Sequence, residues 1–211
     1  MTTAIVGTGG LGSVIARQLA SGGEALRLSS SDKASARALA GQIGRASTVA
    51  ADNRDALQGA GAVVLALRFV VLKGVIEEIA DSVADEVVIV PSNPVGLDAN
   101  GNVSRLLPQG RPSGTVVRGW LPAGANLAMA FGTLPAELFQ SSSNRSPELA
   151  VLFYATDHDH AGEEVERLIR VAGFAPVKVG GIDQSSRLEV GGDLHELVVG
   201  VAEAQSLVGD A

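Results

Sequence analysis

The chain contains no cysteine among its 211 residues, and only 3% of its residues are aromatic. The absence of cysteine excludes disulfide bonds, thiolate nucleophiles and cysteine-ligated metals. The scarcity of aromatic residues predicts a core built from aliphatic side chains. Basic residues are outnumbered, 16 against 23 acidic ones, which gives a formal net charge of −7. We therefore expect no nucleic-acid partner, because no basic stripe is present to displace counterions from phosphates.

Long hydrophobic runs are also missing. The first apolar run is far too short to span a bilayer, and no basic segment precedes it, so we expect no membrane contact and a cytoplasmic location. Apolar residues nevertheless make up 46% of the chain and charged residues only 18%, which is typical of a globular protein. This length suits one α/β domain with an extension or a small second domain.

The most informative segment opens the chain, where a short apolar run ends in a Gly-x-Gly-x-x-Gly pattern. An amphipathic helical pattern follows at once, which is the strand–turn–helix context of a dinucleotide-binding loop. In such a loop Gly7 permits the tight turn, Gly9 lets the backbone approach a pyrophosphate, and Gly12 lets the helix pack closely. The diphosphate then binds free N–H groups at the helix N-terminus. The candidate cofactor-binding loop comprises Gly7, Thr8, Gly9, Gly10, Leu11 and Gly12.

Strand and helix patterns alternate through the first half, which predicts an α/β fold with a Rossmann-type, doubly wound parallel sheet. Asp32 or Ser31 is expected to cap the second helix, and Asp52 the third. Strands are expected at about 3–7, 25–28, 47–50, 62–67 and 86–90, and helices at 10–21, from 31 or 32 to 42, 52–59 and 70–83.

Residues 92–114 are rich in Asn, Gly, Pro and Ser, which predicts a loop and a boundary. The expected domains are a dinucleotide-binding domain at 1–114 and a smaller mixed α/β half at 115–211. A helix is expected from Asp157 or Asp159 to about residue 172. Another is expected near the C-terminus, where Asp193 and Glu196 resemble a capping box. Strands are expected in this half at 115–118, 127–131, 149–154 and 176–179.

The end of the second strand bears on the choice of cofactor. NAD sites place a carboxylate there against the ribose 2′-OH, whereas NADP sites carry small polar and basic groups. Here the strand ends in Ser29, Ser30 and Ser31, with Lys33 close by and no acid before Asp32. The hydroxyls favour the 2′-phosphate of NADP. NAD remains the alternative, with Asp32 as the ribose ligand, although its position beyond the strand favours a helix-terminal residue.

Two further tracts supply candidate site residues. Leu67, Arg68 and Phe69 follow the predicted central strand, at the carboxyl edge where α/β sheets bind ligands. Arg68 is a candidate for holding an anionic group, or else a solvated loop residue. Thr133 and Pro135 are candidate catalytic residues in a turn predicted to form the lip near the nicotinamide, and the alternative is an ordinary strand-to-helix turn.

The histidines divide into two cases. His195 is a candidate proton donor or substrate ligand, and the alternative is a hydrogen-bonded interface histidine. His158 and His160 alternate with aspartates, which can suggest a divalent metal. Successive residues of a first helical turn point in different directions, however, so a polar capped turn is expected and no metal site.

Taken in order along the chain, these landmarks resemble the NADP-dependent deazaflavin (coenzyme F420) reductases, and the N-terminal domain of the STEAP metalloreductases is similar. Asn93, in the Ser-Asn-Pro turn after the fifth strand, joins the candidate cofactor-binding residues. The resemblance implies a Rossmann domain, a small C-terminal half, a homodimer, and hydride exchange between NADP and a flavin-like partner. It is carried by the glycine loop, the serine tract 29–31, the turn 92–94, and the tracts 130–137, 153–155 and 186–197.

The chain departs from the family pattern at three places. Ser31 stands where the family usually has an arginine that grips the 2′-phosphate. Arg68-Phe69 replaces a proline followed by an aromatic residue, and Gly132 replaces an asparagine or histidine. These departures affect cofactor choice and the hydride acceptor.

The sequence thus predicts an NADP-dependent oxidoreductase that exchanges a hydride with coenzyme F420, a flavin or another small molecule. Such transfer depends on ring placement more than on acid–base side chains. One alternative is a non-catalytic NADP-sensing module. Another is a β-hydroxyacid dehydrogenase, whose lysine normally lies in an all-helical second domain, whereas this chain has no lysine between Lys73 and Lys178.

Overall fold

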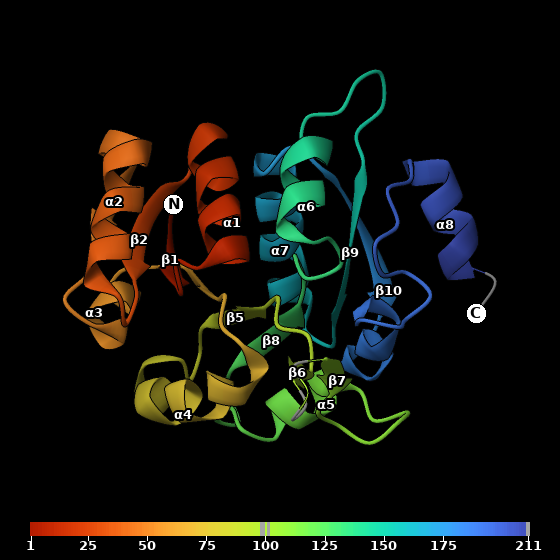
Figure 1. The fold of residues 1–211 in the computed structure, drawn as a ribbon, viewed down its shortest axis with the longest axis horizontal. Helices are drawn as coiled ribbons and strands as arrows, with labels where there is room; N and C mark the ends of the chain where they lie inside the picture. Colours follow the sequence, from red (N-terminus) through yellow and green to blue (C-terminus); the bar gives the residue numbers. More distant parts are fainter. Residues whose placement is uncertain (98–99, 101, 210–211) are drawn as a thin grey trace.

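The computed structural model describes residues 1–97, 100 and 102–209. Its main sheet has eight strands in the order β10-β9-β8-β5-β4-β1-β2-β3 (Figure 1). The strands are β1 (Thr2–Val6), β2 (Ala25–Ser29), β3 (Ser47–Val49), β4 (Ala62–Leu65), β5 (Val87–Val90), β8 (Asn126–Met129), β9 (Val151–Thr156) and β10 (Ala175–Gly180).

Neighbouring strands of this sheet are parallel except β8 and β9, which pair antiparallel. The order from β3 to β8 is that of a Rossmann sheet, and the strand order reverses between β1 and β4. The predicted α/β fold with a doubly wound sheet is therefore confirmed. Ligands of such sheets bind at the carboxyl ends of the strands beside the reversal.

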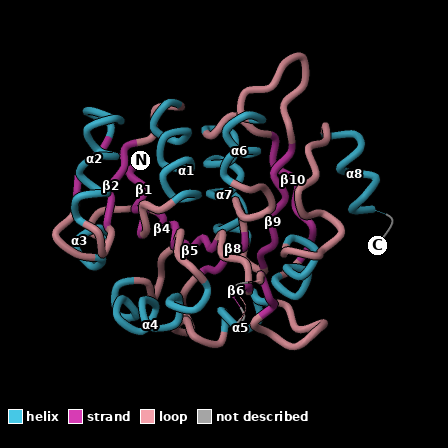
Figure 2. Tube along the Cα trace, in the orientation of Figure 1, coloured by secondary structure: helices cyan, strands magenta, loops and turns pink. Residues whose placement is uncertain are grey.

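Helices cover both faces of the sheet, as Figure 2 shows. The sheet separates two hydrophobic cores, because successive side chains of a strand point to opposite faces. In β1, Ala4 and Val6 point into one core and Ile5 into the other. One face carries α1 (Gly10–Ser21), α2 (Lys33–Ile43), α6 (Ala136–Ser142) and α7 (Asp159–Val171), and the other carries α3 (Asn53–Leu57), α4 (Phe69–Ile79), α5 (Ser113–Arg118) and, beside β10, α8 (Val201–Gly209).

The strand predicted at residues 115–118 is wrong, because these residues belong to α5. The β-branched residues Thr115, Val116 and Val117 favour a strand by propensity. A distant segment decides otherwise: Glu189 Oε1 accepts the backbone N–H of Ser113 at 2.6 Å, and Ser185 Oγ accepts that of Gly114 at 2.9 Å. These two bonds satisfy N–H groups that a helix start leaves unpaired, so tertiary contacts override the local preference.

The segment predicted as a loop contains a small antiparallel hairpin, β6 (Val95–Leu97) and β7 (Val103–Arg105). Three-residue strands carry too few positions for a periodic signal. The domain boundary predicted after residue 114 falls within α5, and the main sheet continues on both sides of it. The division into domains stays a prediction.

The predicted start of the C-terminal helix is wrong, and so is the predicted cap of α7, although α7 begins at Asp159 within the predicted range. The C-terminal helix begins at Val201, not at the predicted capping box, because Asp193 pairs with Arg187 at 2.7 Å instead of capping. The cap position of α7 is His158, whose side chain makes no capping bond, while Asp157 Oδ1 accepts the N–H of Ile182. Asp32 and Asp52 do cap α2 and α3, as predicted. None of the described helices is both long and apolar enough to cross a bilayer.

A hydrogen bond to a carboxylate joins α7 to β9, and an ion pair within α7 holds the same carboxylate. The Tyr154 hydroxyl donates to Glu166 Oε1 at 2.7 Å, and Arg170 donates to Glu166 Oε2 at 2.7 Å. These bonds lower the pKa of the Glu166 carboxyl below its ordinary value, the tyrosine bond being the largest cause. Burial, together with the adjacent carboxylate, raises the pKa of Tyr154 well above its usual range.

This lowered pKa predicts a pH dependence of stability. Charged Glu166 stabilises the fold above its ordinary pKa, and the contribution is lost as the pH falls through the lowered folded value. In Glu166→Gln the free energy of unfolding should fall by about 1 kcal/mol at neutral pH and match wild type in acid. Urea unfolding between pH 7 and pH 3 measures this. Glu163→Gln, an exposed change on the same helix, should leave the pH profile unchanged. If the free energy of unfolding changed equally with pH in wild type and Glu166→Gln, the pH dependence would not come from Glu166.

Candidate functional site

A cleft of about 500 Å³ opens at the carboxyl edge of the sheet, beside the reversal of strand order. It lies between the β1–α1 turn, the end of β2 and the start of α4. A second hollow of about 210 Å³ adjoins it and extends past the start of α1 toward the end of β5. The cleft is lined by Val6, Gly7, Thr8, Gly9, Ser30, Ser31, Asp32, Ser35, Asn53, Ala66, Leu67, Arg68, Val71 and Val75, and the hollow by Gly9, Gly10, Leu11, Gly12, Ala66, Leu67, Arg68, Pro91 and Ser92.

Two glycines of the loop are required by close backbone packing. Gly7 has φ +102°, a left-handed conformation that other residues rarely adopt, and its N–H donates to Ser29 O at 2.8 Å. A Cβ on Gly12 would collide with the carbonyl oxygen of Gly7 and would lie 2.9 Å from Ala66 Cβ. The start of α1 therefore lies directly against β1 and β4.

Gly9 and Gly10 have a different environment. A Cβ built on either residue meets no atom within 4 Å, so the space in front of them is open. Gly9 is the N-cap of α1 and supplies no side-chain cap. The N–H groups of the first turn thus face an open cleft at the positive end of the helix dipole, which favours an anion.

The serine tract after β2 is only partly available to a ligand. Ser29 is buried, and its hydroxyl donates to Asn53 Oδ1 at 2.8 Å. Ser30 Oγ accepts the N–H of Asp32 at 3.2 Å, and Ser31 is exposed. Ser30 and Ser31 line the cleft, whereas Ser29 supports it from below.

Asp32 also lines the cleft, but its carboxylate already has partners. Asp32 Oδ1 accepts the N–H groups of Ala34 at 3.0 Å and Ser35 at 3.2 Å, which caps α2. Lys33, the first residue of α2, lies partly exposed and does not line either hollow. The helix-capping interpretation of Asp32 is confirmed by this geometry.

The turn after β4 forms the opposite wall. Leu67 and Arg68 line both hollows, and Arg68 is exposed at the cap position of α4. Ser92 Oγ donates to Leu67 O at 2.6 Å and fixes this turn to the end of β5. Phe69 instead points into the core, where its ring lies 5.4 Å from that of Trp120.

Sequence reasoning did not single out six residues that line the cleft, namely Val6, Ser35, Asn53, Ala66, Val71 and Val75. Ser35 Oγ lies 3.1 Å from Thr8 Oγ1 and ties α2 to the glycine loop. Val71 and Val75 stand four positions apart on α4, so they share one side of that helix. Val71 is 40% exposed, which the sequence alone does not show, so the spacing of the two valines was the one available signal.

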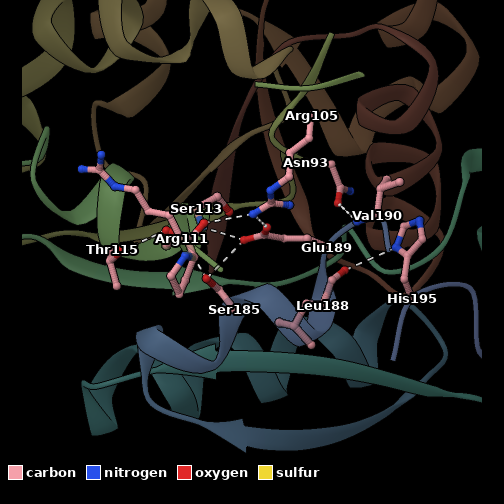
Figure 3. A network of polar contacts seen from close by, with 12 residues as sticks. Asn93, Arg105, Arg111, Ser113, Thr115, Ser185, Leu188, Glu189, Val190 and His195 are labelled. Atoms are coloured by element: carbon pink, nitrogen blue, oxygen red, sulfur yellow. Dashed lines mark hydrogen bonds and ion pairs between the residues drawn. The ribbon is translucent and has the colours of Figure 1, made fainter. Parts of the chain in front are cut away.

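Asn93 joins three loops at the carboxyl edge. Its Nδ2 donates to Gly132 O at 2.9 Å, and its Oδ1 accepts the N–H of Val190 at 2.7 Å (Figure 3). Each end of the amide therefore has a backbone partner. The geometry gives Asn93 a positioning role, and direct contact with a cofactor stays a prediction.

Thr133 and Pro135 lie behind the cleft rather than on its surface. Thr133 is only 2% exposed, and its carbonyl accepts the N–H of Glu196 at 2.8 Å. Pro135 occupies the cap position of α6. Neither residue lines the two hollows, so a catalytic role for them stays a prediction.

His195 contacts the chain segment that carries it. Its Nδ1 lies 3.3 Å from Leu188 O (Figure 3). Its Nε2 lies 3.8 Å from Glu196 Oε1. Nearby, Arg187 pairs with Asp193 and donates to Leu207 O at 2.8 Å, and the guanidinium lowers the pKa of the Asp193 carboxyl. These contacts suit a histidine that holds its own turn, and a catalytic role for it also stays a prediction.

The described residues include no cluster of three or more His, Asp or Glu side chains that could hold a metal ion.

The first part of the chain is similar to a known protein family. Residues 2–94 match the family model for NADP oxidoreductase, coenzyme F420-dependent. The predicted family resemblance is confirmed. No curated protein matches the chain.

Several solved structures are similar over most of the chain. A hypothetical protein from Sinorhizobium meliloti, SMa0349, is 28% identical, with a TM-score of 0.76 over 95% of this chain and 96% of that one. A candidate F420-dependent NADP-reductase from Arthrobacter sp. FB24 is 18% identical, with a TM-score of 0.71 over 85% of each chain. An imine reductase from Myxococcus stipitatus, solved in complex with NADP+, is 17% identical, with a TM-score of 0.66 over 100% of this chain and 63% of that one. The last two likenesses show a shared fold.

The packing of the loop predicts unequal effects of adding one methyl group. Gly12→Ala places a Cβ against backbone and should lower the free energy of unfolding by about 2 kcal/mol or more. Gly10→Ala is the matched control on the same helix, and it should be neutral or stabilise by up to about 1 kcal/mol. Urea denaturation followed by circular dichroism measures both. Similar stabilities for the two variants would show that α1 does not approach β1 as described.

Proposed function

We propose that the chain is an NAD(P)-dependent oxidoreductase that binds NADP along the two hollows and exchanges a hydride with a flavin-like acceptor. The observation that carries this proposal is the glycine loop. Gly7 and Gly12 are sterically required, while Gly9 leaves open space in front of unpaired helix N–H groups. A diphosphate fits this cradle, because a Cβ at Gly9 would occupy the space that the phosphates need.

The adenosine half of the nucleotide would lie in the larger hollow. Val71, Val75, Ser30 and Ser31 line this hollow. The two valines would provide an apolar surface for the adenine, and the two serines would face the ribose 2′-position. Small hydroxyl side chains leave room for a 2′-phosphate and can donate to it. The exposed guanidinium of Arg68 supplies positive charge from the opposite wall.

Asp32 does not act as the ribose carboxylate in this proposal. Its Oδ1 already accepts two backbone N–H groups of α2. Turning Oδ1 toward a ribose would leave those N–H groups without their cap, which costs about 1 kcal/mol, so only Oδ2 remains for a ligand. NADP is favoured over NAD because the small hydroxyls of Ser30 and Ser31 leave room for a 2′-phosphate.

The nicotinamide half would lie along the smaller hollow, past Leu11 toward Pro91 and Ser92. When bound, NADPH supplies the hydride that a second ring accepts. The residues that line this hollow include no aromatic side chain, since the five phenylalanines and the tyrosine are buried elsewhere. The acceptor ring is therefore expected to stack on the nicotinamide itself. Coenzyme F420 or a flavin fits this requirement.

The named alternative is a module that binds NADP without turnover. Oxidation of NADPH, assayed in turn against deazaflavin, FMN, FAD, ferric chelates and quinones, separates the two. An oxidoreductase consumes NADPH with at least one of these acceptors, whereas a sensor binds NADPH and consumes none. A homodimer and a cytoplasmic location stay predictions, and light scattering tests the first.

The open space at Gly9 predicts that a substitution there impairs nucleotide binding while the protein still folds. In Gly9→Val the added side chain occupies open space, so the protein should stay folded, and its free energy of unfolding should fall by no more than about 1 kcal/mol because valine is a poorer N-cap than glycine. Affinity for NADPH should fall at least a hundredfold, because the side chain fills the position of the diphosphate. Isothermal titration calorimetry measures the affinity. Unchanged binding in a folded Gly9→Val protein would refute the proposed nucleotide site.

The serine pair predicts cofactor choice. Ser30→Asp brings a carboxylate to the 2′-position, where it repels a phosphate and can accept from a free 2′-OH. NADP affinity should fall at least tenfold, and NAD affinity should stay equal or rise. Ser21→Asp makes the same charge change at the C-terminal end of α1, away from the cleft, and should alter neither. A wild-type preference for NAD would instead assign the ribose to Asp32.

A further inference from the structure

A small cavity lies behind the cleft, between the end of β8 and the 3-10 turn at 182–188. It offers about 20 Å³ of space for the centre of a water molecule. One water-sized sphere occupies about 10–15 Å³, so the cavity is large enough for a single water molecule. Among its lining residues are Thr133, Ser185 and Glu189.

Thr133, one of the lining residues, has a buried hydroxyl group. Its side chain is 2% exposed, and Oγ1 has no hydrogen-bond partner among the described residues. A buried hydroxyl without a partner costs about 1–3 kcal/mol. Buried polar groups of this kind are normally satisfied by protein atoms or by ordered water.

Two other lining residues, Glu189 and Ser185, supply hydrogen-bond acceptors. Glu189 is only 3% exposed, and its carboxylate accepts from Arg105 at 2.7 Å, from Ser113 N at 2.6 Å and more weakly from Ser185 Oγ at 3.5 Å (Figure 3). A carboxylate has about four acceptor positions, so one position remains. Ser185 Oγ also accepts the N–H of Gly114.

We propose that this cavity binds one water molecule that bridges Thr133 Oγ1 to Glu189 and Ser185. Because a carboxylate only accepts, the water donates one hydrogen to Glu189. Its remaining hydrogen and lone pairs pair with the hydroxyls of Thr133 and Ser185. The water thereby has the two to four polar partners that buried waters normally have.

This bridge joins two parts of the molecule that are far apart in sequence. Thr133 belongs to the turn that Asn93 holds at Gly132, next to Pro91 and Ser92 of the cofactor hollow. Glu189 anchors α5 and, through Arg105, the β6–β7 hairpin. The water site would therefore connect the wall of the cleft to the network of Figure 3. It does not depend on the identity of the cofactor.

The direction in which the unfolding midpoint changes in Thr133→Val tests the proposed water bridge. Thr133→Val keeps the shape and removes the hydroxyl, so a bridged hydroxyl predicts a lower unfolding midpoint than in wild type. An unpartnered hydroxyl predicts an equal or higher midpoint, because its removal relieves an unpaired polar group. Thr133→Ser keeps the hydroxyl and should stay closer to wild type than Thr133→Val.

Ser113→Ala is the matched control. Ser113 Oγ is also buried without a partner among the described residues, but Ser113 does not line this cavity, and its N–H bond to Glu189 survives the change. Its unfolding midpoint should stay equal or rise. A parallel fall in Ser113→Ala and Thr133→Val would overturn the proposal, since the loss would then not depend on the cavity.

A crystal structure of the wild-type protein at high resolution tests the proposed water independently. The proposal expects one water peak within 3.2 Å of both Thr133 Oγ1 and a Glu189 oxygen. A cavity without solvent density, or an unfolding midpoint for Thr133→Val at or above that of wild type, would overturn the proposal.

Discussion

The close approach of α1 to β1 and β4 is the constraint on which the site depends. It brings Gly12 against the carbonyl of Gly7 and leaves no space for a Cβ. The N-terminus of α1 is thereby held at the carboxyl edge of the sheet, beside the reversal of strand order. The cleft, its helix dipole and its two walls all follow from that placement.

Several contacts of the second half of the chain support this edge. Backbone groups near Gly132 and Val190 are held by the Asn93 amide, and Glu189 anchors the start of α5. These contacts join residues that are 39 to 97 positions apart in sequence. The candidate residues Asn93, Thr133 and His195 thus serve the scaffold in this structure, and their direct chemical roles stay predictions.

The sequence predicted well where local periodicity and the glycine pattern carry the signal. The five strands of the first half, the caps Asp32 and Asp52, and the steric roles of Gly7 and Gly12 were found in this way. The strand predicted at 115–118 failed because a remote carboxylate stabilises a helix there. The helix predicted from Asp193 failed because Arg187 engages that aspartate. Such partners are distant in sequence, so no local pattern contains them. The inward orientation of Phe69 likewise depends on Trp120.

A crystal structure of the protein with NADPH tests the central claim most directly. The account predicts the diphosphate within hydrogen-bond distance of the N–H groups at the start of α1, with the 2′-phosphate beside Ser30 and Ser31. Arg68 should lie against the nucleotide from the opposite wall. A nucleotide bound elsewhere, or a diphosphate that does not touch the glycine loop, would contradict the account.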